Sequence, residues 1–128
     1  MIYLDSSVVL ASLLTERRRA PEAMWLQDLA SSRLLEYEVW NRIHARQFAT
    51  ALGGRTQELI NLIQLVELTP AVLRRALQAF PVSARTLDSL HLATAEHLRA
   101  LDQDVMLASF DQRMLAAARA LNIPLYDL

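Results

Sequence analysis

Four carboxylates stand in apolar surroundings at predicted strand ends or on predicted helices: Asp5, Glu38, Asp88 and Asp111. Asp5 directly follows the apolar run Ile2-Tyr3-Leu4, and Asp111 follows an apolar run that ends at Phe110. Because parallel strands end at the same edge of a sheet, acids in these places would converge on one cleft. Clustered carboxylate oxygens suit Mg²⁺ or Mn²⁺. Such an ion can activate a water for attack on a phosphodiester.

Each acid also has a purely structural interpretation. Asp5 and Asp111 could cap the helices that follow them, and the helix dipole would favour Asp88 in a first turn. Glu38 could form an i,i+4 ion pair with Arg42, whereas Glu36 is expected on a solvated face. Asp88 has mainly apolar neighbours one turn away, which predicts a substantially buried carboxylate in need of a positive partner. Together, these interpretations leave the clustering of the four acids unexplained.

Apolar periodicity predicts the elements that would position these acids. Helices are expected over residues 8–14, 21–30, 33–52, 57–63, 70–80, 86–101 and 112–121, and strands over 1–4, 65–68, 105–110 and 123–126. The helix over 33–52 would be capped by Ser31 or Ser32 and end at Gly53-Gly54, the only two glycines. This arrangement leaves little room for a full strand before Ser31. Alternating strands and helices predict an α/β fold, a parallel sheet with helices on both faces.

Composition limits both the class of protein and its chemistry. The 128 residues, 53% of them hydrophobic, are typical of one compact domain over residues 1–128. The absence of cysteine excludes thiolate metal sites, and the absence of lysine excludes a P-loop or a Schiff base. No apolar run reaches the ~20 residues of a membrane span, and the order of apolar and basic residues is wrong for a secretory signal. A cytoplasmic protein is therefore expected.

Charge and histidine spacing narrow the chemistry further. The net charge of −1 gives no reason for strong non-specific attraction to phosphates, so local positive charge would come from the bound cation. A phosphorelay receiver domain is excluded because it requires a lysine, which this chain lacks. A haloacid dehalogenase-type phosphatase is excluded because it requires an aspartate at the position of Ser7. His44, His91 and His97 lack the paired spacing of a zinc motif, so they are interpreted as core or surface residues and none is assigned to catalysis.

Four segments of the chain, in order, resemble the PIN-domain nucleases and in particular the VapC toxins. The segments are Ile2-Tyr3-Leu4-Asp5-Ser6-Ser7, Ser31-Ser32-Arg33-Leu34-Leu35 leading to Glu38, Arg85-Thr86-Leu87-Asp88-Ser89-Leu90-His91-Leu92-Ala93, and Ala108-Ser109-Phe110-Asp111. The third segment is the most specific. It departs from the family at Ser89, where alanine is commoner.

The resemblance implies a three-layer α/β/α domain with a short parallel sheet of about four to five strands. It also implies a Mg²⁺-dependent endoribonuclease toxin, with Mn²⁺ as a possible substitute, that a cognate VapB-like antitoxin inhibits by covering the acidic pocket. The family's metal-binding acids correspond to Asp5, Asp88 and Asp111, and Glu38 takes the place of its helical glutamate. Ser6 and Ser109 match hydroxyl residues that support the first and last acids.

Partners and alternatives follow from the same resemblance. Family members commonly form homodimers, and the apolar Met24, Trp25 and Trp40 could serve that interface or the antitoxin, although core packing is the preferred interpretation. One alternative function is a catalytically silent PIN-like module that binds RNA or protein. Another is a nuclease that acts outside any toxin–antitoxin system. The target RNA cannot be read from these residues.

Overall fold

The computed structural model describes residues 1–101 and 103–128 of the chain. In these residues a four-stranded, fully parallel sheet has the order β3-β2-β1-β4. Its strands are β1 (Ile2–Leu4), β2 (Leu29–Ser32), β3 (Ile63–Val66) and β4 (Met106–Ala108). The chain thus begins in a central strand, and the predicted parallel sheet is confirmed.

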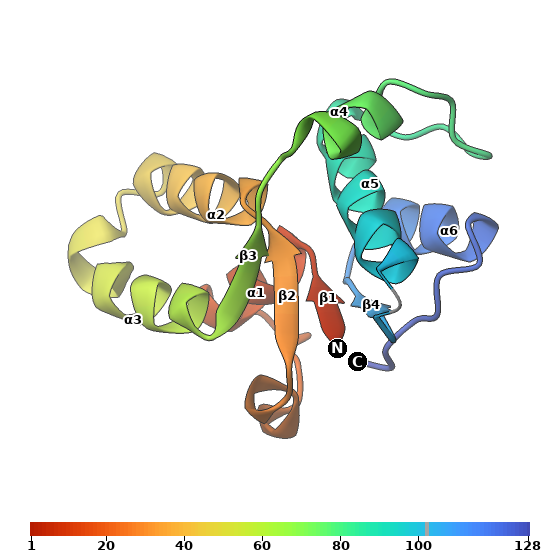
Figure 1. Ribbon diagram of the computed structural model, residues 1–128. Helices are drawn as coiled ribbons and strands as arrows, with labels where there is room; N and C mark the ends of the chain where they lie inside the picture. Colours follow the sequence, from red (N-terminus) through yellow and green to blue (C-terminus); the bar gives the residue numbers. More distant parts are fainter. Residues whose placement is uncertain (102) are drawn as a thin grey trace.

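Helices cover both faces of the sheet (Figure 1). On one face lie α1 (Ser6–Leu13), α2 (Leu34–Ala45) and α3 (Ala49–Asn61), and on the other α5 (Thr86–Ala100) and α6 (Gln112–Ala120), with α4 (Pro70–Ala76) packed on α5. The sheet separates two hydrophobic cores. Side chains alternate along β1, so Ile2 and Leu4 point into the core beneath α1, α2 and α3, and Tyr3 points into the core beneath α5 and α6. The predicted three-layer α/β/α fold is confirmed.

The predicted helix over residues 21–30 is wrong. A short 3-10 helix, η1 (Glu22–Leu26), occupies its first half, and the chain then becomes extended and enters β2. All four residues of β2 are buried, because a central strand is covered on both faces. Its second half is Ser31-Ser32, so β2 shows neither the apolar alternation nor the apolar run by which a strand is predicted from sequence.

The predicted single helix over residues 33–52 is also wrong. The N-cap of α2 is Arg33, one residue after the predicted Ser32, although the Ser32 Oγ accepts the Leu34 N–H at 3.1 Å. The helix ends at Ala45, and Gln47 turns the chain with φ 58°. Gly53 and Gly54 lie inside α3. A helical glycine costs only about 1 kcal/mol relative to alanine, less than the burial of a large apolar side chain contributes. The apolar face of α3 therefore outweighs the two glycines.

The remaining differences concern short elements. The strand predicted over 105–110 is shorter in the structure, where β4 covers only Met106–Ala108. The segment 123–126 forms no strand and makes a single bridge, between Leu107 and Leu125. Met24 is fully buried, and Trp25 and Trp40 pack against the same core, as preferred from the sequence. Within residues 1–101 and 103–128, every helix is too short or too polar to cross a membrane.

Candidate active site

All four predicted acids line one cavity of about 550 Å³ beyond the carboxyl ends of β1 and β4. Asp5 comes from the end of β1, Glu38 from α2, Asp88 from the first turn of α5, and Asp111 from the start of α6. These segments are up to 106 residues apart in the sequence, from residue 5 to residue 111. The fold therefore gathers the acids at the place where ligands bind in open α/β sheets.

Asp5 is the most buried of the four acids, with only 5% of its surface exposed. The parallel register pairs Leu4 with Ala108, so the next residues along the two strands, Asp5 and Ser109, become neighbours. The Ser109 hydroxyl donates to Asp5 Oδ2 at 2.6 Å. Burial raises the pKa of Asp5 above its ordinary value, and the hydroxyl hydrogen bonds oppose that rise. The site thus holds a carboxylate at a considerable desolvation cost.

The other oxygen of Asp5 is held by Ser7, which sequence reasoning did not assign. Asp5 Oδ1 accepts the Ser7 backbone N–H at 3.1 Å and its hydroxyl at 2.5 Å. Ser7 Oγ also accepts the Phe110 N–H at 2.9 Å, which joins the end of β1 to the segment after β4. The Asp-x-Ser spacing at a helix start is the signal that could have identified Ser7.

Asp88 and Asp111 are more exposed than Asp5. Asp88 is half-buried, less than predicted, because it lies in the first turn of α5, and its Oδ2 accepts the Arg85 N–H at 3.4 Å. Asp111 is exposed, and its Oδ1 accepts the Arg113 N–H at 2.9 Å. The capping interpretation is therefore correct for Asp5 and Asp111, and Asp88 stands in the first turn of α5, where the helix dipole favours it. Capping uses one oxygen of Asp88 and one of Asp111, so in the described part of the chain the second oxygen of each stays without a hydrogen bond.

Glu38 contacts His91 instead of forming the considered ion pair with Arg42. Glu38 Oε1 lies 2.5 Å from His91 Nε2, and Oε2 accepts the Ser6 hydroxyl at 3.4 Å. Both Glu38 and Arg42 belong to the described residues, and no ion pair joins them. Ser6 thus supports Glu38, whereas the resemblance pairs it with Asp5. Glu36 binds Arg33 at 3.0 Å, consistent with a partly solvated face.

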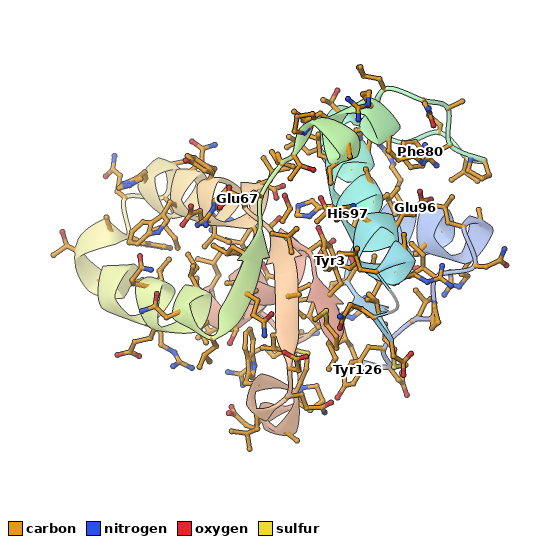
Figure 2. All side chains as sticks on the ribbon, viewed as in Figure 1. Tyr3, Glu67, Phe80, Glu96, His97 and Tyr126 are labelled. Atoms are coloured by element: carbon orange, nitrogen blue, oxygen red, sulfur yellow. The ribbon has the colours of Figure 1, made fainter. Side chains whose placement is uncertain are left out.

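His91 is buried, as its apolar surroundings suggest, but it bridges two polar groups. It lies one turn after Asp88, is 2% exposed, and its Nδ1 lies 2.8 Å from the Tyr3 hydroxyl. Figure 2 shows Tyr3 between the sheet and α5. The Tyr3 oxygen also accepts the Ser32 N–H at 3.2 Å. Sequence spacing gives no sign of this contact, because Tyr3 and His91 are 88 positions apart.

The donor set of the cavity fits a hard divalent cation, since it offers several carboxylate and hydroxyl oxygens and no thiolate. As the side chains are placed, no three aspartate, glutamate or histidine residues among those described stand close enough together to hold an ion. Two arginines, Arg42 and Arg85, line the same cavity. The lining therefore carries both anionic and cationic side chains, a combination suited to a phosphate ester held beside a cation.

Comparison with known proteins agrees with the fold. The family model described as "PIN domain" matches residues 2–120. Ribonuclease VapC47 of Mycobacterium tuberculosis (strain CDC 1551 / Oshkosh) is 28% identical over 126 residues, 93% of this chain and 90% of the relative. Ribonuclease VapC35 of the same strain is 31% identical over 129 residues, 96% of this chain and 93% of the relative.

Proposed function

The chain belongs to the PIN domain family, and we propose that it is a Mg²⁺-dependent endoribonuclease of the VapC type. The observation that carries this proposal is the convergence of four carboxylates from four separate elements on one cavity at the end of the sheet. The proposal is also supported by similarity to two proteins named ribonucleases over more than nine-tenths of the chain. Mn²⁺ shares the ligand preferences of Mg²⁺ and would substitute for it.

In this proposal Asp5, Asp88 and Asp111 hold the cation, and Ser109 keeps Asp5 oriented. The cation, when bound, supplies an activated water and neutralises charge on the leaving oxygen. Carboxylates repel one another, so the three aspartates would draw together only around positive charge. The oxygens of Asp88 and Asp111 that no cap uses are available for this purpose.

The remaining polar groups of the cavity would hold the RNA. Arg42 and Arg85 lie where a phosphodiester next to the acids would need cationic partners, and guanidinium groups bind phosphates in a bidentate manner. Glu38 would accept a proton or a hydrogen bond from the attacking water, because one side of its carboxylate faces the cavity. The chain would thus position a single phosphate between two arginines and four acids.

The partners proposed for this protein follow from its similarity to VapC ribonucleases. RNA is the substrate, a VapB-like antitoxin would cover the acidic cavity, and both would meet the protein in the cytoplasm. That residues 1–128 form a single domain stays a prediction, and so does the formation of a homodimer. The experiment for the antitoxin is a search for a small open reading frame beside the gene and co-expression of its product with this chain, followed by a cleavage assay of the purified complex and of the chain alone.

Cleavage of RNA by the purified chain tests the function itself. We expect cutting of total RNA with Mg²⁺ or Mn²⁺, none in EDTA, and none from Asp5→Asn under any condition. Hydrolysis by water would leave a 5′-phosphate and a 3′-hydroxyl on the fragments. A folded wild type that binds Mn²⁺ and RNA but never cuts would contradict the proposal and favour the silent binding module.

A further inference from the structure

We propose that His91 is a positioning residue of this site: together with Tyr3 it holds the Glu38 carboxylate at the wall of the cavity. This inference rests on the proposed function, since the consequence of misplacing Glu38 is read in RNA cleavage. His91 itself does not need to touch RNA or the cation. It acts through Glu38, which lines the cavity beside Asp5 and Asp88.

The contacts form a continuous chain across three elements. Tyr3 on β1 lies 2.8 Å from His91 Nδ1, and His91 on α5 lies 2.5 Å from Glu38 on α2 through Nε2. The helices α2 and α5 belong to opposite layers, so the His91–Glu38 contact joins the two layers above the end of the sheet. The rings of Tyr3 and His91 meet edge to face at 79°, with their centroids 5.9 Å apart.

The hydrogen bonds of Tyr3 favour one direction for this chain. Its oxygen accepts the Ser32 N–H, which leaves the hydroxyl proton for donation to His91 Nδ1. A phenol, whose ordinary pKa is about 10, keeps that proton at neutral pH. If Nδ1 accepts, the proton of His91 sits on Nε2 and is donated to Glu38. In this order the Ser32 amide orients Tyr3, Tyr3 orients His91, and His91 orients the Glu38 carboxylate.

Glu38 needs such an orienting group because a second partner lies within reach. The side chain has three rotatable bonds, and Arg42 stands one helical turn away, at the spacing of an i,i+4 ion pair. Without His91, Glu38 would turn toward Arg42. That movement would take the carboxylate from the cavity wall and occupy one of the two arginines proposed to bind phosphate. One substitution would then affect both chemistry and substrate binding.

Two substitutions at His91 separate this role from a merely structural one. His91→Gln places an amide N–H near the position of Nε2 and can still donate to Glu38, whereas His91→Asn ends near Nδ1 and cannot reach it. We expect His91→Gln to keep kcat within several-fold of wild type, and His91→Asn to lower it by about 10- to 100-fold, the usual range for orienting groups. Melting temperatures of both variants serve as the control, because a structural role would make activity follow stability.

Equal losses in the two variants, or equal retention, would overturn the inference. A second measurement does not depend on cleavage or on variants that fold. In ¹⁵N-labelled wild-type protein, long-range ¹H–¹⁵N spectra report which nitrogen of His91 carries the proton. We expect a proton on Nε2, and an unprotonated Nε2 would overturn the proposal. If wild type itself does not cut RNA, the proposed function fails, and the spectrum still decides the direction of the hydrogen-bond chain.

Discussion

Removing the Ser109 hydroxyl should destabilise the protein in a way that depends on pH. Ser109→Ala deletes a 2.6 Å donor to the buried Asp5 carboxylate and the acceptor of the Asp111 N–H at 2.9 Å. A hydrogen bond to a charged group contributes about 1.5–3 kcal/mol and a neutral one about 1 kcal/mol. The expected loss at neutral pH is therefore about 3 kcal/mol of unfolding free energy. In a chain of this length that loss lowers Tm by roughly 10 °C.

The pH dependence has a definite sign. The folded-state pKa of Asp5 is raised by burial, so the native protein keeps this proton to higher pH than the unfolded chain does. Unfolding free energy consequently falls as pH rises through the folded pKa. Loss of the Ser109 hydroxyl, which opposes the rise, would raise that pKa further. The cost of Ser109→Ala should therefore be largest at high pH and shrink at low pH, where Asp5 is protonated in both native proteins.

The assay is urea unfolding in EDTA at several pH values from about 4 to 8, with Ser31→Ala as the matched control. Ser31 is equally buried, and its hydroxyl donates to a neutral acceptor, the Leu4 carbonyl, at 2.6 Å. We expect Ser31→Ala to cost about 1 kcal/mol at every pH. If the two variants lose the same free energy across the range, the argument that Ser109 stabilises a charged, buried carboxylate is refuted.

Three further predictions concern the cation and α3. Asp88→Asn should abolish cleavage. In urea unfolding in EDTA it should change the free energy of unfolding by less than about 0.5 kcal/mol, because an amide oxygen can still accept the Arg85 N–H. A clear loss of unfolding free energy would indicate a structural ion pair instead. Mg²⁺ at about 100 times its Kd should stabilise wild type by about 2.7 kcal/mol and leave Asp5→Asn unchanged in a thermal-shift assay. Gly54→Ala should raise the free energy of unfolding by about 0.5–1 kcal/mol in urea, because Gly54 lies within α3 and a Cβ added there meets no other atom. A lower free energy of unfolding would contradict a helix at this position.

The sequence predicts the parts of the site that depend on local pattern. Asp5 follows a buried strand and Asp111 precedes a helix, so both could be placed from apolar runs and helix-start chemistry alone. The alternation of strands and helices then implies that they share one edge of the sheet. A structural role at a helix start and a place in the cavity are alternatives for each aspartate in the sequence, but in the structure Asp5, Asp88 and Asp111 have both.

The parts that were missed depend on tertiary contacts. The sequence does not predict β2, because a strand buried on both faces has no alternation of apolar and polar residues. The end of α2 near Gln47 depends on the packing of α2 against α3 and not on the two glycines. The partner of Ser109 is decided by strand register, and His91 meets Tyr3 and Glu38 from distant segments. A lone histidine on an apolar helix face carries no local sign of these bonds.

Whether the acids of this cavity cut RNA through a bound cation can be decided from the initial rate of RNA cleavage as a function of Mg²⁺ concentration. Wild type and Asp88→Asn are compared at equal protein concentration, each shown to be folded. We expect a saturable rise for wild type from zero in EDTA, and no cleavage by Asp88→Asn at any Mg²⁺ concentration. Cleavage that persists in EDTA, or an unchanged curve for Asp88→Asn, would contradict cleavage through a cation bound by these acids.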